Sequence, residues 1–185
     1  MLPVGACVQW RAAMHRRPVM VVIGPRGPTS PALEALGVDL GRRAIEAGFR
    51  VATGGRDGVM DAVSRGARGS GAHRDGDVIA VIPGYDRAEA TPHADLVVPT
   101  GLSLARNVVL VAMADVVVAV GGGAGTLSEI ALAWQLGRPV VALAGSGGWA
   151  ARLAGQAIDD RREGVVVSAS DPERAVAAAL ALLSG

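Results

Sequence analysis

Short runs of apolar, mostly β-branched residues recur along the chain, and most are followed by a longer segment rich in alanine. The runs are continuous rather than alternating, which is typical of strands that are covered on both faces. They predict strands at Val19–Ile23, Arg50–Thr53, Val78–Ile82, Leu96–Val98, Val116–Val120, Val140–Leu143 and Val165–Val167. The segments between them predict helices at Pro31–Ala47, Gly58–Ser70, Ser103–Ala114, Thr126–Leu136, Trp149–Asp160 and Pro172–Leu183. This alternation predicts an α/β fold with a doubly wound parallel sheet, Rossmann-like and in a single domain.

Three polar side chains stand where helix caps are expected. Ser30, Asp57 and Asp171 each come directly before a predicted helix, and short oxygen-bearing side chains are the preferred caps. No repeat, linker or internal boundary follows, so we expect one nucleotide-binding domain over residues 18–185, preceded by an N-terminal extension over residues 1–17.

Composition narrows the function classes. Half of the 185 residues are hydrophobic and the formal net charge is +1, so neither disorder nor a general attraction to nucleic acid or membrane is indicated. The longest apolar run, Val108–Val120, contains Asp115 and is too short to span a membrane, and no secretory signal is evident. We therefore expect a cytoplasmic protein that binds no nucleic acid and no membrane.

The basic residues exclude two kinds of chemistry. All 18 are arginine, because the chain contains no lysine. A pyridoxal-phosphate Schiff base needs a lysine amine, and the Walker A loop needs its lysine on the phosphates. The single cysteine and the three scattered histidines have no spacing suited to a metal, so we expect no metal site.

Glycine-rich loops follow three of the predicted strands. In doubly wound sheets the ligand binds beyond the carboxyl ends of the strands, so these loops are the candidate binding elements. The third loop leads straight into a helix, where glycines let a phosphate approach backbone N–H groups and the helix N-terminus adds partial positive charge. The candidate phosphate- or nucleotide-binding residues are Gly24, Gly54, Gly55, Gly58, Gly122, Gly123, Ala124, Gly125 and Thr126.

Two side chains near the third loop are candidates for catalysis. Glu129 follows the loop, and Arg106 stands early on the preceding helix, so both should lie at the ligand edge of the sheet. Each also has an ordinary structural interpretation. Glu129 is spaced from Thr126 as in a capping box, and Arg106 could be a solvated or ion-paired side chain. The loop does not match the NAD fingerprint, because Thr126 stands where its last glycine should be.

These motifs together resemble the Lonely Guy superfamily, whose members are often mislabelled lysine decarboxylases. Its motifs G-G-G-x-x-G-x-M and P-G-G-x-G-T-x-x-E appear here as the segments 53–60 and 121–129, and the resemblance covers about Val19 to Leu183. Thr53 replaces the first glycine of one motif and Gly121 the proline of the other. Family hydrolases usually have Glu-Arg-Lys where this chain has Ala-Arg-Asn around Arg106. These differences are more similar to a sister branch that includes molybdenum-cofactor carrier proteins.

The resemblance implies a nucleotide-binding Rossmann protein with one of two functions. Family hydrolases cleave the N-glycosidic bond of nucleoside 5′-monophosphates and need no cofactor, with an arginine and a glutamate that correspond to Arg106 and Glu129. The alternative is a carrier that binds molybdenum cofactor or a nucleotide without turnover. Either way, we expect a small phosphorylated ligand. Because the helices Ser103–Ala114 and Thr126–Leu136 are unusually apolar, we also expect a homodimer or a dimer of dimers.

Overall fold

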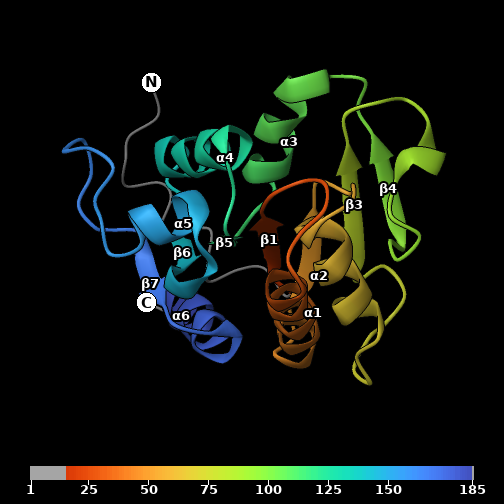
Figure 1. Cartoon of the computed structure of the whole chain (residues 1–185), viewed down its shortest axis with the longest axis horizontal. Coiled ribbons are helices and arrows are strands. Elements are labelled where there is room, and N and C mark those ends of the chain that lie inside the picture. Colours follow the sequence, from red (N-terminus) through yellow and green to blue (C-terminus); the bar gives the residue numbers. More distant parts are fainter. Residues whose placement is uncertain (1–15, 185) are drawn as a thin grey trace.

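The computed structural model describes residues 16–184 and contains one sheet of seven parallel strands with helices on both faces (Figure 1). The strands are β1 (Val19–Ile23), β2 (Arg50–Thr53), β3 (Val78–Ile82), β4 (Leu96–Pro99), β5 (Val116–Ala119), β6 (Val140–Leu143) and β7 (Val167–Ala169). The helices are α1 (Pro31–Glu46), α2 (Val59–Arg68), α3 (Arg106–Ala112), α4 (Ala124–Gln135), α5 (Gly148–Leu153) and α6 (Pro172–Ser184). Short 3₁₀ turns are η2 (Arg87–Glu89), η3 (Ser103–Ala105) and η4 (Ala144–Ser146). The expected single-domain Rossmann-like fold is confirmed.

The strand order is β4-β3-β2-β1-β5-β6-β7, so the chain builds one half of the sheet outward from β1 and then returns to build the other. Every neighbouring pair is parallel; β1 pairs with β2 on one side and with β5 on the other. The sheet therefore reverses its winding between β1 and β5. At such a point the loops beyond the carboxyl ends diverge and leave a crevice for a ligand.

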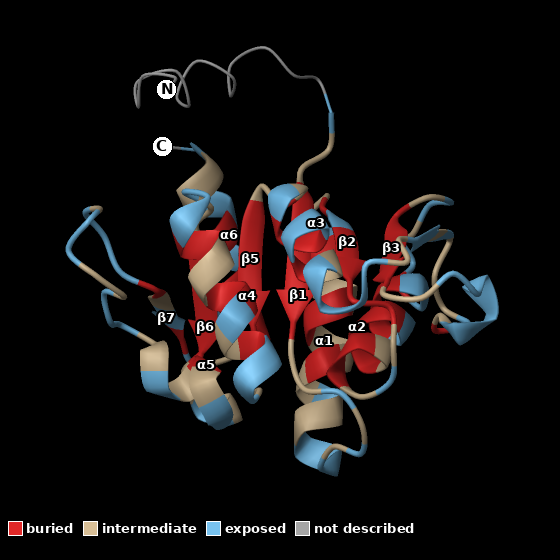
Figure 2. Ribbon diagram, turned by 90° about the horizontal axis from the view of Figure 1, so that it is seen from above, coloured by how far each residue is buried: buried red, intermediate tan, exposed pale blue. Residues whose placement is uncertain are grey.

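Alternate residues of the central strands enter two separate apolar clusters. Met20 and Val22 pack with α1, α2 and α6, whereas Val21 and Ile23 pack with α3, α4 and α5. Figure 2 shows the central strands as buried, and Figure 1 shows helices on both sides of the sheet. The continuous apolar runs of the sequence arise because both faces of these strands are covered.

Helices α1 and α2 approach each other backbone to backbone. A Cβ on Gly41 would lie 2.0 Å from the carbonyl oxygen of Val63, and one on Gly66 would lie 2.0 Å from that of Val38. A third glycine, Gly37, faces Ala62 at the same contact. No larger residue fits at Gly41 or Gly66 without separating the helices, so these glycines set the distance between α1 and α2.

Two of the three expected helix caps are confirmed. The Ser30 hydroxyl accepts the N–H of Leu33 at 3.2 Å, and the Asp171 carboxylate accepts that of Arg174 at 2.9 Å. The cap expected at Asp57 is wrong. Helix α2 begins after Gly58, whose φ of +74° turns the chain without a side-chain cap, and Asp57 instead pairs with Arg26.

The helix expected at Trp149–Asp160 is too long. Helix α5 ends at Leu153, because Ala154 is not helical and Gly155 has a φ of +79°. The last strand is also displaced from the expected Val165–Val167 to Val167–Ala169. Val166 is engaged elsewhere: its N–H bonds to the carbonyl of Gln156, and its own carbonyl accepts the N–H of Gly155.

The outer surface of the β4 half is unusually apolar. Leu96 and Val98 of the edge strand are exposed, as are Leu104, Val108 and Val109 around α3.

Most of the expected extension, residues 1–15, lies outside the described residues, so the proposed boundary stays a prediction. Within residues 16–184, no helix is both long and apolar enough to cross a membrane.

Candidate functional site

Three glycine-rich loops meet at the carboxyl edge of the sheet beside β1 and β5. A Cβ on Gly24, after β1, would lie 2.9 Å from the carbonyl oxygen of Val120 at the end of β5. A Cβ on Gly58 would lie 2.5 Å from the carbonyl oxygen of Pro25, which also accepts the N–H of Val59. Gly24 and Gly58 thus serve close packing between loops, and together the loops form one surface at the crevice.

The loop after β5 has a backbone that requires glycine. Gly121 and Gly122 have φ values of +58° and +95°, and Gly122 passes so close to Thr126 that a Cβ there would meet the threonine side chain. Gly123 is the N-cap of α4 and supplies no side-chain acceptor. The N–H groups of the first helical turn therefore have no acceptor within the helix, which is the usual basis of an anion site.

The space in front of this helix start is open. A Cβ added to Gly123 or to Gly125 would meet nothing within 4 Å, and neither residue has a positive φ. Ala124 and Gly125 are exposed, whereas the Thr126 side chain is buried beneath the loop. A phosphate could therefore approach the N–H groups of residues 124–126 without displacing any side chain.

The loop is supported from below by residues that the sequence did not single out. The Ser146 hydroxyl accepts the N–H of Gly121 at 2.7 Å and donates to the carbonyl of Leu143 at 2.6 Å. The N–H of Trp149 bonds to the carbonyl of Gly122, and Gly148 has no side chain because one would meet that carbonyl at 2.4 Å. These contacts hold the loop in position, but no sequence motif at Ser146 or Trp149 predicts them.

Arg106 and Glu129 face each other at the same edge. Arg106 is the first residue of α3, and its Nη1 lies 3.8 Å from Oε1 of Glu129 on the second turn of α4. Their side chains are only 11% and 10% exposed. The Arg106 guanidinium also lies against the loop after β2, because a Cβ on Gly54 would be 2.4 Å from Nη1. The absence of a side chain at Gly54 thus makes room for the arginine.

Burial destabilises the charged forms of both Arg106 and Glu129, and their mutual contact does not fully compensate. Burial raises the pKa of Glu129 to about 7, although the charge of Arg106 partly opposes that rise. Burial likewise lowers the pKa of Arg106, and the nearby charge of Arg56 adds to that effect. Nε and Nη1 of Arg106 are buried without a hydrogen-bond partner. Since buried donors are nearly always paired, these two N–H groups are suited to an acceptor on a ligand.

The capping role considered for Glu129 is wrong. Helix α4 begins at Ala124 rather than at Thr126, so Glu129 is the sixth helical residue and lies beyond the turn that a capping box serves. The neighbouring Ser128 hydroxyl donates instead to the carbonyl of Gly125 and accepts a 3.4 Å bond from the Asn107 amide. The buried carboxylate of Glu129 therefore has no evident structural role apart from its pairing with Arg106.

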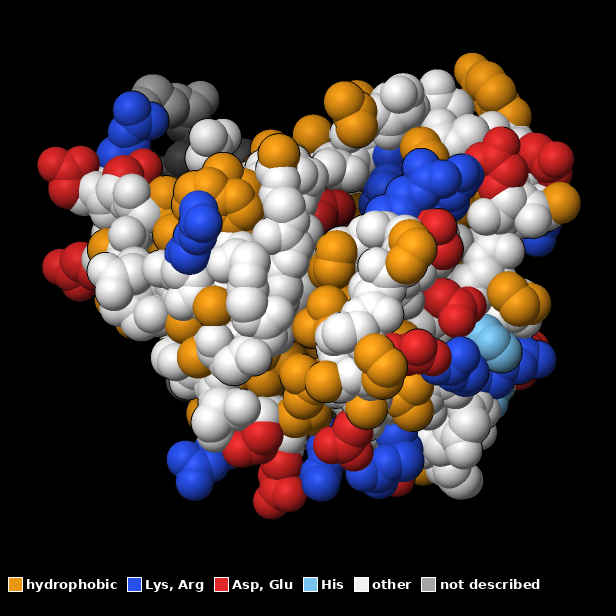
Figure 3. All heavy atoms as spheres, viewed as in Figure 1, with side chains coloured by type: hydrophobic (Ala, Val, Ile, Leu, Met, Phe, Trp, Pro, Cys, Tyr) orange, Lys and Arg blue, Asp and Glu red, His pale blue; other side chains and the backbone are white. Residues whose placement is uncertain are grey.

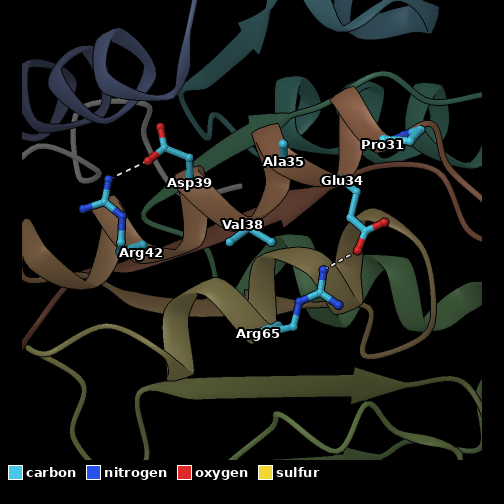
Figure 4. A pocket seen from close by; sticks show the side chains of 7 residues that line it. All are labelled: Pro31, Glu34, Ala35, Val38, Asp39, Arg42 and Arg65. Atoms are coloured by element: carbon cyan, nitrogen blue, oxygen red, sulfur yellow. Dashed lines mark hydrogen bonds and ion pairs between the residues drawn. The ribbon is translucent and has the colours of Figure 1, made fainter.

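Neither Arg106 nor Glu129 lines either of two hollows on the described surface. A shallow groove of about 410 Å³ runs between α1 and α2, where ion pairs such as Arg42–Asp39 and Arg65–Glu34 line it (Figure 4). It contains none of the predicted site residues. A smaller hollow of about 280 Å³ includes Gly58, with Arg56 and Glu89 on its wall. Among residues 16–184, no group of acidic, histidine or cysteine side chains is arranged to hold a metal ion.

A family comparison fits this arrangement. The model of the SLOG cluster4 family matches residues 17–176, nearly the whole of the described chain. The chain belongs to the SLOG cluster4 family. Together with the solved structures described next, this match confirms the resemblance to the Lonely Guy superfamily and to its molybdenum-cofactor-carrier-like branch.

Solved structures of similar proteins extend the comparison. The SLOG cluster4 chain is 38% identical to the protein TM1055, with a TM-score of 0.79 over 87% of this chain and 97% of that one. It is 32% identical to the molybdenum cofactor binding protein of the phototrophic bacterium Rippkaea orientalis, with a TM-score of 0.77 over 92% and 99%. The molybdenum cofactor carrier protein of Chlamydomonas reinhardtii gives the same identity and TM-score over 91% and 100%.

One curated relative also matches. An uncharacterised protein of Archaeoglobus fulgidus is 38% identical over 104 residues, which is 56% of this chain and 66% of that protein. The match thus spans somewhat less than two thirds of the relative. This relative is a further protein of similar sequence, and its description indicates no activity for the SLOG cluster4 chain.

The structure brings most of the predicted site residues to one edge, but in different roles. Gly123, Ala124 and Gly125 border open space, and Arg106 and Glu129 form a buried pair beside them. Gly24, Gly55 and Gly58 instead allow close packing or a positive φ within the loops. Arg56, which sequence reasoning did not select, also lies near Arg106.

Proposed function

We propose that this SLOG cluster4 protein binds a small phosphorylated ligand at the carboxyl edge of the sheet and carries it without breaking a bond. The ligand phosphate would accept the free N–H groups of residues 124–126 at the start of α4. The open space over Gly123 and Gly125 carries this proposal, because a phosphate can occupy it without any rearrangement. Molybdenum cofactor is the ligand that we propose, since two proteins similar over nearly their whole length are described as binding or carrying it.

The residues present suit such a ligand. A pterin cofactor with a phosphate ester would place its phosphate on the helix start, while the remaining anionic part would face the two unpartnered N–H groups of Arg106. Binding would then depend on backbone groups and arginine rather than on a side-chain ligand to the metal.

A glycine substitution tests the phosphate position. Gly125→Val should abolish ligand binding and leave the fold intact, because the added methyl groups would fill the phosphate space while its backbone conformation suits any residue. Gly71→Val is the matched control, since Gly71 also borders open space but lies at the other end of α2. Calorimetric titration with a nucleoside monophosphate and with purified molybdenum cofactor would measure both variants. Unchanged affinity in a folded Gly125→Val protein would exclude this position.

A second function is favoured by Glu129, namely hydrolysis of the N-glycosidic bond of a nucleoside 5′-monophosphate. A buried carboxyl whose pKa is about 7 can exchange a proton near neutral pH. It could deprotonate the attacking water or stabilise an oxocarbenium-like transition state, while Arg106 orients it or holds the phosphate. This reaction needs neither a cofactor nor a lysine.

Glu129→Gln separates the two functions. If Glu129 is catalytic, loss of its charge should lower the release of free base by a factor of about a hundred or more. A carrier should release no base before the substitution and bind its ligand nearly as well after it. Chromatographic detection of free base from a panel of nucleoside monophosphates makes this comparison. Equal release by both proteins would mean that hydrolysis occurs without Glu129.

We also propose that the protein is a homodimer or a dimer of dimers, assembled through α3 and α4. Val108 is exposed on α3, Leu104 on η3 just before it and Leu136 at the C-cap of α4. Such large apolar side chains usually mark an interface when they cluster. Val108→Asp should therefore produce monomers, whereas Leu180→Asp on α6, where the side chain is equally apolar and exposed, should not. Light scattering that finds the wild type monomeric at micromolar concentration would contradict this assembly.

A further inference from the structure

A second arginine, Arg56, lies beside the candidate site on the loop after β2. Its neighbour Gly55 has a φ of +70° and Gly58 a φ of +74°, so the backbone around it is tightly turned. The Arg56 side chain is 21% exposed and donates to the carboxylate of Glu89 in η2, which is 41% exposed. The arginine is thus held at the edge of the sheet by a partner that faces solvent.

Arg106, at the start of α3, packs against the short loop that carries Arg56. The guanidinium of Arg106 lies against Gly54, two residues before Arg56, and the charge of Arg56 helps to lower the pKa of Arg106. Figure 3 shows blue side chains gathered above α2, near the carboxyl end of β3. Two like charges close to each other repel, and an anion bound between them offsets that repulsion because it attracts both.

The acidic groups nearby do not balance these arginines. The Glu129 carboxylate lies 3.8 Å from Nη1 of Arg106, which is too long for a hydrogen bond. Its pKa of about 7 also leaves a large part of the carboxyl uncharged at neutral pH. Glu89 contacts Arg56 from the solvent side, whereas the nearby Asp57 pairs with Arg26 and Asp61 with Arg65. Nε and Nη1 of Arg106 have no acceptor at all. The cluster therefore has more donors and more positive charge than its own residues satisfy.

We propose that Arg56 and Arg106 form a second anion subsite. In the free protein the Glu89 carboxylate pairs with Arg56, and an anionic group of the ligand replaces that carboxylate on binding. The inference rests on the proposed function, because the first anion is the phosphate on residues 124–126. The arginines lie at the loop after β2 and the glycine loop follows β5, with β1 between them. Two strand spacings separate these loops, about 10 Å. The ligand class is thus a small molecule with two anionic groups roughly that far apart.

Inorganic phosphate can test the two subsites separately, because it can bind to each one alone. We would titrate phosphate into ¹⁵N-labelled protein and follow two sets of NMR signals. The first set is the backbone amides of residues 122–126, and the second is the side-chain Nε–H signals of Arg56 and Arg106. Both sets should shift in the wild type. In Gly125→Val the amide response should disappear while the arginine response remains.

Variants of the ion pair then test the role of Glu89. Arg56→Gln should weaken phosphate binding measured at Arg106 by about tenfold or more, since a charged donor is lost. Glu89→Gln should tighten it by roughly two- to fivefold, because an exposed carboxylate that competes for Arg56 is removed. Glu46→Gln is the matched control: Glu46 is 44% exposed and pairs with Arg42 at the C-terminal end of α1, so binding should not change.

The outcomes separate the inference from the proposed function. Shifts in the loop amides without shifts at the arginines would overturn the second subsite and leave the proposed phosphate position standing. Shifts at the arginines alone would support the subsite and contradict the proposed phosphate position. No shift in either set would overturn both. If Glu89→Gln binds phosphate no more tightly than Glu46→Gln does, Glu89 does not compete with the anion for Arg56.

Discussion

At the amino edge of the sheet, buried carboxylates are fully paired, whereas at the carboxyl edge the Arg106–Glu129 pair is not. Asp77, Asp95 and Asp115 each stand directly before a strand, and each forms an ion pair with an arginine. Each also accepts a backbone N–H, from Arg74, Val78 and Val19 respectively. The Asp77 and Asp95 side chains are almost completely buried, yet their oxygens have several donors.

The opposite edge is built from similar charges with fewer bonds. Glu129 has only the 3.8 Å contact with Arg106, and two N–H groups of that arginine have no acceptor. Paired buried charge fixes strands to one another, while unpaired buried charge costs stability unless something else supplies the partner. The contrast separates an edge that stabilises the fold from one that is suited to a ligand.

The largest effect should come from the amino edge. Asp95→Ala should lower the free energy of unfolding by about 3 kcal/mol, because it leaves the Val78 N–H and the side chains of His73 and Arg68 without their acceptor. Urea denaturation would measure the loss. A change below about 1 kcal/mol would show that this carboxylate is not the structural anchor that its bonds indicate.

Glu129→Gln should raise the free energy of unfolding rather than lower it, and the size of this gain should depend on pH. Because the pKa of Glu129 is raised from 4.5 to about 7, the folded state binds its proton more tightly than the unfolded state does. The wild type should therefore lose stability relative to the variant as pH rises from about 4.5 to 7, by on the order of 2–3 kcal/mol. Melting curves of both proteins across this range make the test. A constant difference would mean that the carboxyl is not perturbed.

Added phosphate should stabilise the protein through the carboxyl edge alone. At ten times the dissociation constant, the gain is about 1.4 kcal/mol if the unfolded chain binds none. The gain should fall in Gly125→Val and persist in Asp95→Ala, which differs only at the amino edge. Melting temperatures with phosphate, at constant ionic strength, would measure it, and an equal gain in all three proteins would indicate a nonspecific salt effect.

The smallest effect is expected at an exposed ion pair on the carboxyl edge. Asp57→Asn breaks the ion pair with Arg26, in which both side chains are more than half exposed, and the change in unfolding free energy should stay below about 0.5 kcal/mol. It is the exposed counterpart of Asp95→Ala. If urea denaturation shows a loss as large as that of Asp95→Ala, burial does not account for the difference between the edges.

The sequence predicted the sheet better than the ends of its helices. Continuous apolar runs identify the five inner strands as buried, and the runs at β4 and β7 form partly exposed edge strands. All seven strands are present in the parallel arrangement expected. The start of α4 was misplaced by two residues, because Thr126 has the chemistry of a cap whereas the glycine loop begins the helix with no side chain. Helix α5 was extended too far, because its alanine-rich sequence does not reveal the left-handed turn at Gly155.

The candidate site was predictable only where the strand order determines it. Arg106 and Glu129 were expected at one edge because both lie near the carboxyl ends of strands, and the structure brings them within 3.8 Å. Arg56 could not be found in that way. Its setting depends on Glu89, which lies 33 residues further along the chain in the segment between β3 and β4, and no local pattern predicts that contact.

The glycine contact between α1 and α2 has a mechanical consequence. Because Gly41 and Gly66 bring the two backbones together with no flexible side chain between them, the helices should move as a single rigid body. The loops at Gly24–Gly27 and Gly54–Gly58 lead into the N-terminal ends of these two helices. The crevice therefore has one stiff wall. We therefore expect deformation that admits a ligand to occur within the opposite wall, where α3 and α4 carry Arg106 and Glu129.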